Sequence, residues 1–145
     1  MKIAVLADTH GRLPEPVANA IREADEIWHL GDFADPTMVA ALRRLGPPFV
    51  GVLGNCDAGI DLPETVRLER GGRSFLLIHI PPAKPSGADF LLHGHTHVPR
   101  DEMVNGVRVL NPGTIGKPNH GAPPSYAWLD VDAASGAVTW GVVRV

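Results

Sequence analysis

The chain has 145 residues, with 44% hydrophobic residues, 20% charged residues and a formal net charge of -3. This length is sufficient for a hydrophobic core, so we expect one domain over residues 1–145. The acidic balance argues against a general nucleic-acid coat protein, and no stable nucleic-acid partner is expected. One cysteine excludes an intrachain disulfide, and the apolar stretch before Asp8 is too short for a signal peptide or membrane span. We therefore expect a cytoplasmic protein with no membrane partner.

The first third of the chain alternates apolar runs with helical patterns. Three continuous apolar runs predict buried strands, at residues 3–7, 27–30 and 49–53. Two sets of apolar residues at helical spacing predict the helices between them: Val17, Ile21 and Ala24, then Met38, Leu42 and Leu45. This strand-helix-strand-helix-strand order predicts a parallel sheet with crossover helices.

The remainder of the chain is rich in predicted strands. They fall at residues 65–68, 74–80, 90–92, 103–110, 126–131 and 138–145. The run 103–110 contains Asn105-Gly106, a strong hairpin signal, so it predicts two strands and a turn. We expect a layered α/β fold in which a second sheet packs on the first. The apolar segment 138–145 is also a candidate contact between copies of the chain in a homo-oligomer.

Five short motifs of metal-binding character follow the apolar runs in order. They are Asp8-Thr9-His10, Gly31-Asp32, Gly54-Asn55-Cys56-Asp57, His79 and Gly94-His95-Thr96-His97. Seven of their side chains are metal-ligand candidates, namely two carboxylates, one amide oxygen and four imidazoles. This set suits two neighbouring divalent ions, which many enzymes use to cleave phosphate esters. The pattern therefore predicts a dinuclear metal site.

The topology brings the distant motifs together. Asp8, Asp32 and Asn55 each follow one of the first three buried runs, and ligands bind outside the carboxyl ends of parallel strands. In the pairs Asp8-x-His10 and His95-x-His97, the two side chains would lie on the same side of an extended segment. Two divalent ions, two aspartates and a bridging hydroxide would leave the site at about +1, which favours an anionic phosphate ester.

Together with Asn111-Pro112-Gly113-Thr114, the order of these motifs resembles the calcineurin-like metallophosphoesterases. The resemblance is nearest to their small, single-domain phosphodiesterases of bacteria and archaea, and it extends from Asp8 to about Pro118. It implies an α/β fold, a four-layer α-β-β-α sandwich of two mixed sheets. It also implies a metal-dependent phosphoesterase that acts on phosphodiesters.

The resemblance further implies a role for each motif residue. One metal would be held by Asp8, His10, Asp32 and His97, and the other by Asp32, Asn55, His79 and His95, with Asp32 bridging. A metal-bridging hydroxide would attack phosphorus in line with the leaving group, and Asn55 would also hold a phosphate oxygen. Asp32, Asn55 and His10 are the expected catalytic residues. Manganese is the first expectation for the metal, and nickel, iron, cobalt and zinc also suit these ligands.

The chain departs from its relatives at three places. Cys56 stands where many relatives have a histidine that protonates the leaving group, so the general acid is unidentified. Ile80-Pro81-Pro82 follows His79, where glycine is usual, and the helix expected before Gly94 is missing. We predict that this short segment leaves the site more open than in relatives. Finally, residues 118–120 read Pro-Asn-His where relatives often have Pro-Arg.

Several nearby residues have structural interpretations. We interpret His29 as a buried structural histidine, His93 as making no contact with substrate or metal, and Cys56 as packing near the metals. Asp57 is expected to hold a hydrogen bond that orients a ligand.

The alternative function is a non-enzymatic, metal-binding interaction scaffold, since a retromer subunit shares the fold of this family. The seven intact ligand positions favour catalysis over that scaffold. A structural zinc site would normally be closed by cysteines, which this ligand set does not match.

Overall fold

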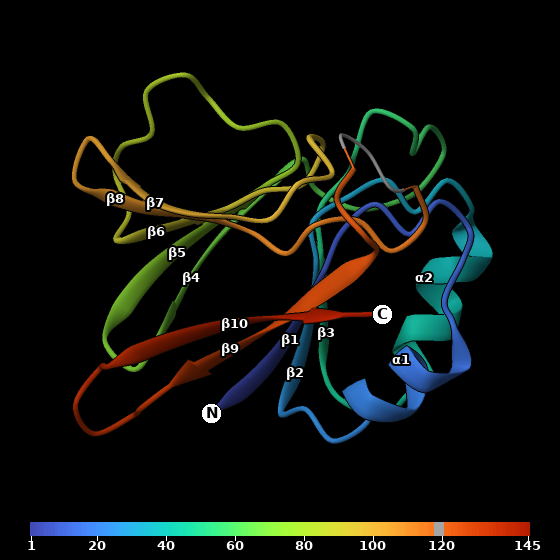
Figure 1. Cartoon of the computed structure of the whole chain (residues 1–145), viewed down its shortest axis with the longest axis horizontal. Helices are drawn as coiled ribbons and strands as arrows, with labels where there is room; N and C mark the ends of the chain where they lie inside the picture. The colour runs from blue at the N-terminus through green and yellow to red at the C-terminus, as the bar shows by residue number, and fades with distance from the viewer. Residues whose placement is uncertain (118–120) are drawn as a thin grey trace.

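The computed structural model describes residues 1–117 and 121–145, so the segment 118–120 that replaces Pro-Arg lies outside the described residues. The first of two five-stranded sheets has the order β10-β9-β1-β2-β3 (Figure 1). Its members are β1 (Lys2–Leu6), β2 (Glu26–His29), β3 (Phe49–Gly51), β9 (Ser125–Val131) and β10 (Val138–Arg144). The strands β1, β2 and β3 are parallel, as predicted, and β9 and β10 are antiparallel.

The second sheet has the order β4-β5-β6-β8-β7. Its strands are β4 (Thr65–Arg70), β5 (Arg73–Ile78), β6 (Phe90–Leu92), β7 (Arg100–Val104) and β8 (Val107–Asn111). The three central strands are parallel, and β4 and β7 pair with them in antiparallel fashion at the two edges. Two mixed sheets packed together confirm the predicted α/β fold.

Both helices, α1 (Glu15–Ile21) and α2 (Pro36–Arg43), cover the face of the first sheet that points away from the second (Figure 1). Side chains of β1 point alternately toward the second sheet and toward the helices. Ile3 and Val5 belong to the apolar core between the sheets, whereas Leu6 packs among residues of the helices. A strand buried on both faces in this way reads as the continuous apolar run seen in the sequence.

The outer face of the second sheet is covered differently. It has a small apolar cluster made of Leu76, Leu91, Val107 and Val109. The segment 81–89 runs along this side (Figure 1), and it is tied down by Arg67, whose Nη1 donates to Gly87 O at 3.1 Å. No helix within the described residues forms this fourth layer, in agreement with the helix missing from the sequence.

Some strand ends differ from those predicted. The strand β3 ends at Gly51, two residues early, because the Leu53 N–H donates to Pro63 O and so leaves the sheet. The strand β5 ends at Ile78, which places His79 in the following loop. The predicted run 103–110 proves to be the hairpin of β7 and β8, as Asn105-Gly106 indicates.

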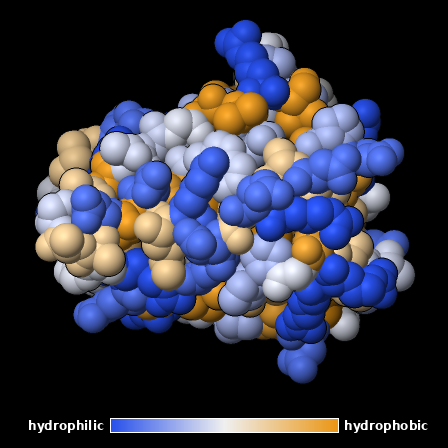
Figure 2. All heavy atoms as spheres, turned by 90° about the horizontal axis from the view of Figure 1, so that it is seen from below, coloured by the Kyte–Doolittle hydropathy of each residue, from blue (hydrophilic) through white to orange (hydrophobic). Residues whose placement is uncertain are grey.

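The surface is mostly hydrophilic on the face shown in Figure 2, where the hydrophobic areas are small and broken up by hydrophilic side chains. Within residues 1–117 and 121–145, neither α1 nor α2 has the length and apolar character that a membrane-spanning helix needs.

Candidate metal centre

The metal-ligand candidates lie in five loops, which follow β1, β2, β3, β5 and β6 at one end of the molecule. Backbone hydrogen bonds join neighbouring loops. The Asp8 N–H donates to Gly31 O at 2.9 Å, and the Gly94 N–H donates to His79 O at 3.1 Å. A bond between the sheets completes the assembly, because the His95 N–H donates to the Asp8 carboxylate at 3.1 Å. The topology therefore brings the five motifs together, as predicted.

Five of the seven candidates have a left-handed backbone. The φ angles are 53° at Asp8, 47° at His10, 63° at Asp32, 71° at His95 and 64° at His97. Such angles are uncommon outside glycine and concentrate at functional sites. The prediction that each i, i+2 pair lies on an extended segment was wrong, because these side chains reach the centre from tight turns after the strands end.

Two motif glycines are required by close packing on ligand candidates. A Cβ at Gly54 would overlap the backbone nitrogen and carboxylate of Asp32. A Cβ at Gly94 would lie 2.9 Å from Asp8 Oδ2 and 3.2 Å from His79 Nδ1. Glycine is therefore required as the first residue of each of these two motifs, because a side chain there would collide with a residue of a different loop.

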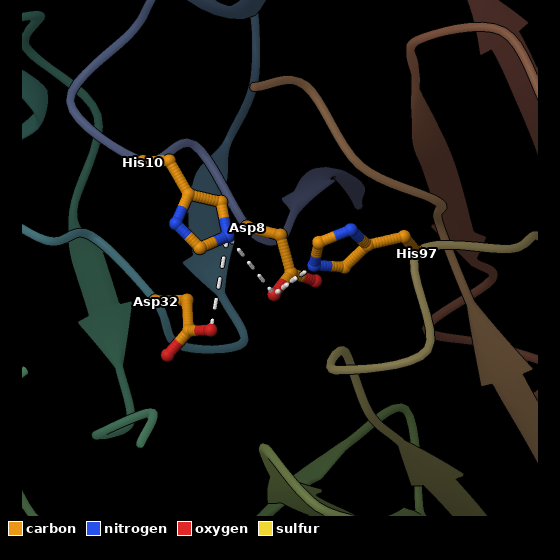
Figure 3. Close-up of side chains that lie close together, drawn as sticks. All are labelled: Asp8, His10, Asp32 and His97. Carbon is orange, nitrogen blue, oxygen red and sulfur yellow. Dashed lines mark ion pairs between the residues drawn. The ribbon is translucent and has the colours of Figure 1, made fainter. Parts of the chain in front are cut away.

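The first group of side chains contains Asp8, His10, Asp32 and His97, each with one ligand atom within 4.8 Å of the others. All four point toward a common centre (Figure 3). His97 Nε2 lies 3.3 Å from Asp8 Oδ1, and His10 Nε2 lies 3.9 Å from Asp8 Oδ1 and 3.8 Å from Asp32 Oδ2. These four are the residues that the resemblance assigns to one metal.

The second group contains Asn55, His79 and His95 beside Asp32. The His79 Nδ1–H donates to Leu30 O at 2.7 Å, which orients the ring, and Nε2 lies 2.9 Å from Asn55 Oδ1. His95 Nδ1 lies 3.1 Å from the same Asn55 oxygen. His79 Nε2 is also 3.3 Å from Asp32 Oδ2, so Asp32 stands between the two groups.

The donor atoms fit divalent metal ions. Asp8 Oδ1 and His10 Nε2 are buried and have no hydrogen-bond partner among the described residues, although both face the centre of the first group. Buried polar atoms normally have partners, so this pair marks a place where a ligand completes the structure. Mixed carboxylate, imidazole and amide donors are the ligands that manganese, iron, nickel, cobalt and zinc accept.

The two carboxylates have opposite pKa shifts. Burial raises the pKa of Asp8 to about 7, against a lowering effect of His79. Burial also acts to raise the pKa of Asp32, but hydrogen bonds with His79 and the Cys56 N–H hold it well below its ordinary range. At neutral pH the centre therefore has one firmly ionised carboxylate beside one that is close to its own titration point.

Asp57 positions two of the motif loops. One of its carboxylate oxygens accepts from the N–H groups of Asp32 at 2.8 Å and Gly54 at 2.7 Å, and the other accepts from the Ala34 N–H at 2.9 Å. The carboxylate is buried, and these bonds fasten the loop after β2 to the loop after β3. The geometry agrees with the interpretation that Asp57 orients a ligand.

The other two buried histidines near the motifs have structural contacts. His29 Nδ1 accepts from the Gly31 N–H at 3.1 Å, so its Nε2–H donates to Thr9 Oγ1 at 3.0 Å. Burial lowers the pKa of His29 to about 3 and that of His93 to about 4, so both rings are neutral. His93 Nδ1–H donates to Gly94 O at 2.7 Å, and neither ring belongs to the two groups of ligand candidates.

Two supporting residues were not singled out by sequence reasoning. Asn111 Nδ2 donates to Gly94 O at 3.3 Å and to Thr96 Oγ1 at 2.9 Å, which fixes the loop that presents the last two histidines. Thr114 Oγ1 donates to Asp8 O at 3.0 Å. The available signal was the motif Asn111-Pro112-Gly113-Thr114, which entered only as part of the resemblance.

Cys56 lies at the exposed side of the centre. The Asn55 Nδ2–H donates to its sulfur at 3.6 Å. Burial and the Asp32 carboxylate raise the pKa of the thiol, so Cys56 is protonated at neutral pH. These contacts agree with a residue that packs beside the centre.

Taken together, the fold and the donor set define an α/β sandwich with a candidate metal centre at the end of its sheets. Residues 1–134 match the calcineurin-like phosphoesterase superfamily domain, and the chain belongs to that family. It is 30% identical to the probable metallophosphoesterase YsnB of Bacillus subtilis in an alignment of 148 positions that covers 91% of this chain and 85% of that protein. It is also 30% identical to the phosphodiesterase YfcE of Escherichia coli K12, with 71% and 64% coverage.

Solved structures agree with the fold. Vps29 from Entamoeba histolytica in complex with Zn²⁺ superposes with a TM-score of 0.78 at 21% identity, and the match covers 99% of both chains. Membership of the metallophosphoesterases implies divalent metal ions, a phosphate-ester substrate and hydrolysis of phosphoester bonds.

Proposed function

We propose that the chain hydrolyses phosphodiesters at a centre of two divalent ions that share Asp32. The observation that carries the proposal is the position of the Asp32 carboxylate. Its Oδ2 lies 3.8 Å from His10 Nε2 in the first group and 3.3 Å from His79 Nε2 in the second. A carboxylate between two sets of ligand atoms is the arrangement that a bridging ligand requires.

In this proposal each group of side chains holds one ion. Asp8, His10 and His97 join Asp32 at the first, and Asn55, His79 and His95 join it at the second. Two such ions, when bound, supply Lewis acidity and activate water for attack on phosphorus. We place manganese first among the candidate ions. The neutral amide of Asn55 keeps the centre more positive than another carboxylate would, which favours an anionic ester.

The residues of the chain have separate tasks. Asn55 is exposed and its Oδ1 faces the two histidine rings, and in this proposal its amide group also holds a phosphate oxygen. His10 places its unpartnered Nε2 between the two aspartates. The Asp57 carboxylate holds the Asp32 N–H, and Asn111 holds the loop of the last two histidines. Preorganised ligands of this kind reduce the reorganisation needed during reaction.

The test uses metal-stripped protein refilled with manganese, nickel or zinc. Bis(4-nitrophenyl) phosphate and 4-nitrophenyl phosphate are the diester and monoester substrates. We expect metal-dependent turnover that favours the diester and falls by about a hundredfold or more in Asn55→Ala. Asn19→Ala is the matched control, because Asn19 is exposed on α1, and it should leave the rate unchanged.

The opposite result is equally specific. Tight binding of two ions with no turnover of either ester would contradict the proposed hydrolysis and favour the interaction scaffold that shares this fold. If Asn55→Ala leaves turnover unchanged, Asn55 is not part of the catalytic centre.

A further inference from the structure

A pocket adjoins the second group of ligand candidates. Its volume is about 430 Å³, and it lies between the loop after β3, the start of β4 and the end of β5. Asn55 and His79 belong both to its wall and to the proposed centre. The space is therefore continuous with the place where the phosphate would bind, and its volume is within the range of about 300–1,000 Å³ that is typical of small-molecule sites.

The remaining wall is mostly apolar. Leu53 and Ala58 come from the loop after β3, Ile78 is the last residue of β5, and Ile80 lies in the loop that follows it. Ile80 is 51% exposed, which is unusual for a large aliphatic side chain and identifies it as a surface available for contact. It follows directly after a metal-ligand candidate, so an apolar group held there would lie beside the reacting ester.

The charged groups of the pocket restrict its occupant. Glu64 is an exposed carboxylate on the wall, whereas the buried Asp57 carboxylate is engaged by three backbone N–H groups. A second anionic group would meet Glu64, and the described residues of the pocket wall include no lysine or arginine to balance it. Negative charge on a substrate is therefore favoured at the metal centre and disfavoured in the pocket.

We propose that this pocket receives an uncharged, largely apolar organic group of the phosphate ester, and that it excludes organic groups with a further anionic charge. The proposal rests on the proposed function, since the phosphate is assigned to the metal centre. It narrows the substrate class to esters of neutral apolar alcohols or phenols. Esters with a second phosphate or a carboxylate on the organic side fall outside that class.

The experiment measures binding, so it does not depend on turnover. Manganese-loaded protein is titrated by calorimetry with phenylphosphonate and methylphosphonate, whose P–C bonds are not hydrolysed. We expect phenylphosphonate to bind about tenfold more tightly or better, because binding in the pocket removes the apolar ring from water. 4-Carboxyphenylphosphonate should lose this advantage, and Glu64→Gln should restore part of it.

A matched pair of variants locates the effect. Ile80→Ser should reduce the phenyl preference severalfold while the affinity for methylphosphonate and for manganese stays unchanged. Met103→Ser is the control, because Met103 is also an exposed aliphatic residue, 66% exposed, but lies on β7 and outside the pocket.

The outcomes separate this proposal from the proposed function. Equal binding of the two phosphonates, or a phenyl preference that survives Ile80→Ser, would overturn the pocket assignment and leave hydrolysis standing. If neither phosphonate binds the manganese-loaded protein, the phosphate site itself is contradicted, and the proposed function fails together with the pocket.

Discussion

Buried carboxylates lie near both ends of β2, but their surroundings differ. Before the strand continues into Trp28, the Glu26 carboxylate accepts from Arg70 Nε at 2.6 Å, Arg70 Nη2 at 3.0 Å and Trp28 Nε1 at 2.9 Å. Beyond the other end of β2, Asp32 lies close to Asp8 from the loop after β1, and Asp8 Oδ1 has no hydrogen-bond partner among the described residues. The carboxylate at one end has its hydrogen-bond partners within the protein, whereas the carboxylates at the other end are arranged to bind a ligand.

The pKa shifts follow the same division. Burial acts to raise the pKa of Glu26, but the hydrogen bonds with Arg70 and Trp28 lower it below its ordinary range. Burial raises the pKa of Asp8 to about 7. Since Arg70 belongs to β4 in the second sheet, the satisfied carboxylate ties the two sheets together. The difference shows where stability has been sacrificed for a ligand site.

The largest effect is expected from Gly54→Ala, which acts on the ligand end alone. The added Cβ would overlap Asp32, so the Asp32 carboxylate must move. We expect metal affinity to fall by about a hundredfold or more, measured by titration of the metal-free protein. Gly141→Ala is the control, because a Cβ there meets no atom within 4 Å. Unchanged metal affinity in Gly54→Ala would contradict the described packing.

A smaller effect is expected at the satisfied end, from Glu26→Gln. The variant should lose about 1–3 kcal/mol of unfolding free energy at pH 7, since it weakens bonds to a charged group. The folded pKa of Glu26 is lowered, so its stabilisation is present above the ordinary value of 4.5 and is lost as the pH falls through the folded value.

Urea unfolding of Glu26→Gln at several pH values tests that expectation. The difference from the parent chain should shrink below pH 4.5, and Glu23→Gln, an exposed change, should show little difference at any pH. If the loss of unfolding free energy in Glu26→Gln stays constant down to pH 3, the ion pair is not its source.

An effect of the opposite sign is expected from Asp8→Asn in the metal-free protein. The folded pKa of Asp8 is about 7 and its ordinary value is 3.8, so between these values the folded state binds more protons than the unfolded state. The stability of the parent chain therefore falls as the pH rises from about 4 to about 7. At pH 8 the variant should be more stable by at least about 1 kcal/mol, although it binds metal poorly.

Thermal unfolding in chelator at pH 4 and pH 8 measures this difference, which should nearly vanish at pH 4. A variant less stable than the parent at pH 8 would show that the Asp8 charge is compensated within the protein.

The sequence predicted the framework well because its signals are local. The continuous apolar runs at 3–7 and 27–30 identified strands buried on both faces, and Asn105-Gly106 identified a hairpin turn. The order of the motifs then led to the family, which the comparisons confirm. The gathering of seven ligand candidates at one end of the sheets follows from parallel topology, which the pattern also contained.

Other features depend on contacts between distant segments. The left-handed turns at Asp8 and His95 replace the expected extended geometry, because the loops of two sheets must meet over a short distance. Asn111 acts on a loop that lies 15 or more residues away in the chain. The pocket wall combines Glu64 with Ile80, which no local pattern connects. Such pairings are set by tertiary structure, and their spacing along the chain gives no sign of them.

If two metal ions share Asp32, the number of ions bound per chain depends on this one residue. Parent chain, Asp32→Ala and the exposed-residue control Asp61→Ala are equilibrated with manganese, and the tightly bound ions per chain are determined by elemental analysis. We expect two ions for the parent and the control and none for Asp32→Ala. A parent chain that binds fewer than two ions, or an Asp32→Ala variant that keeps both, would contradict this expectation.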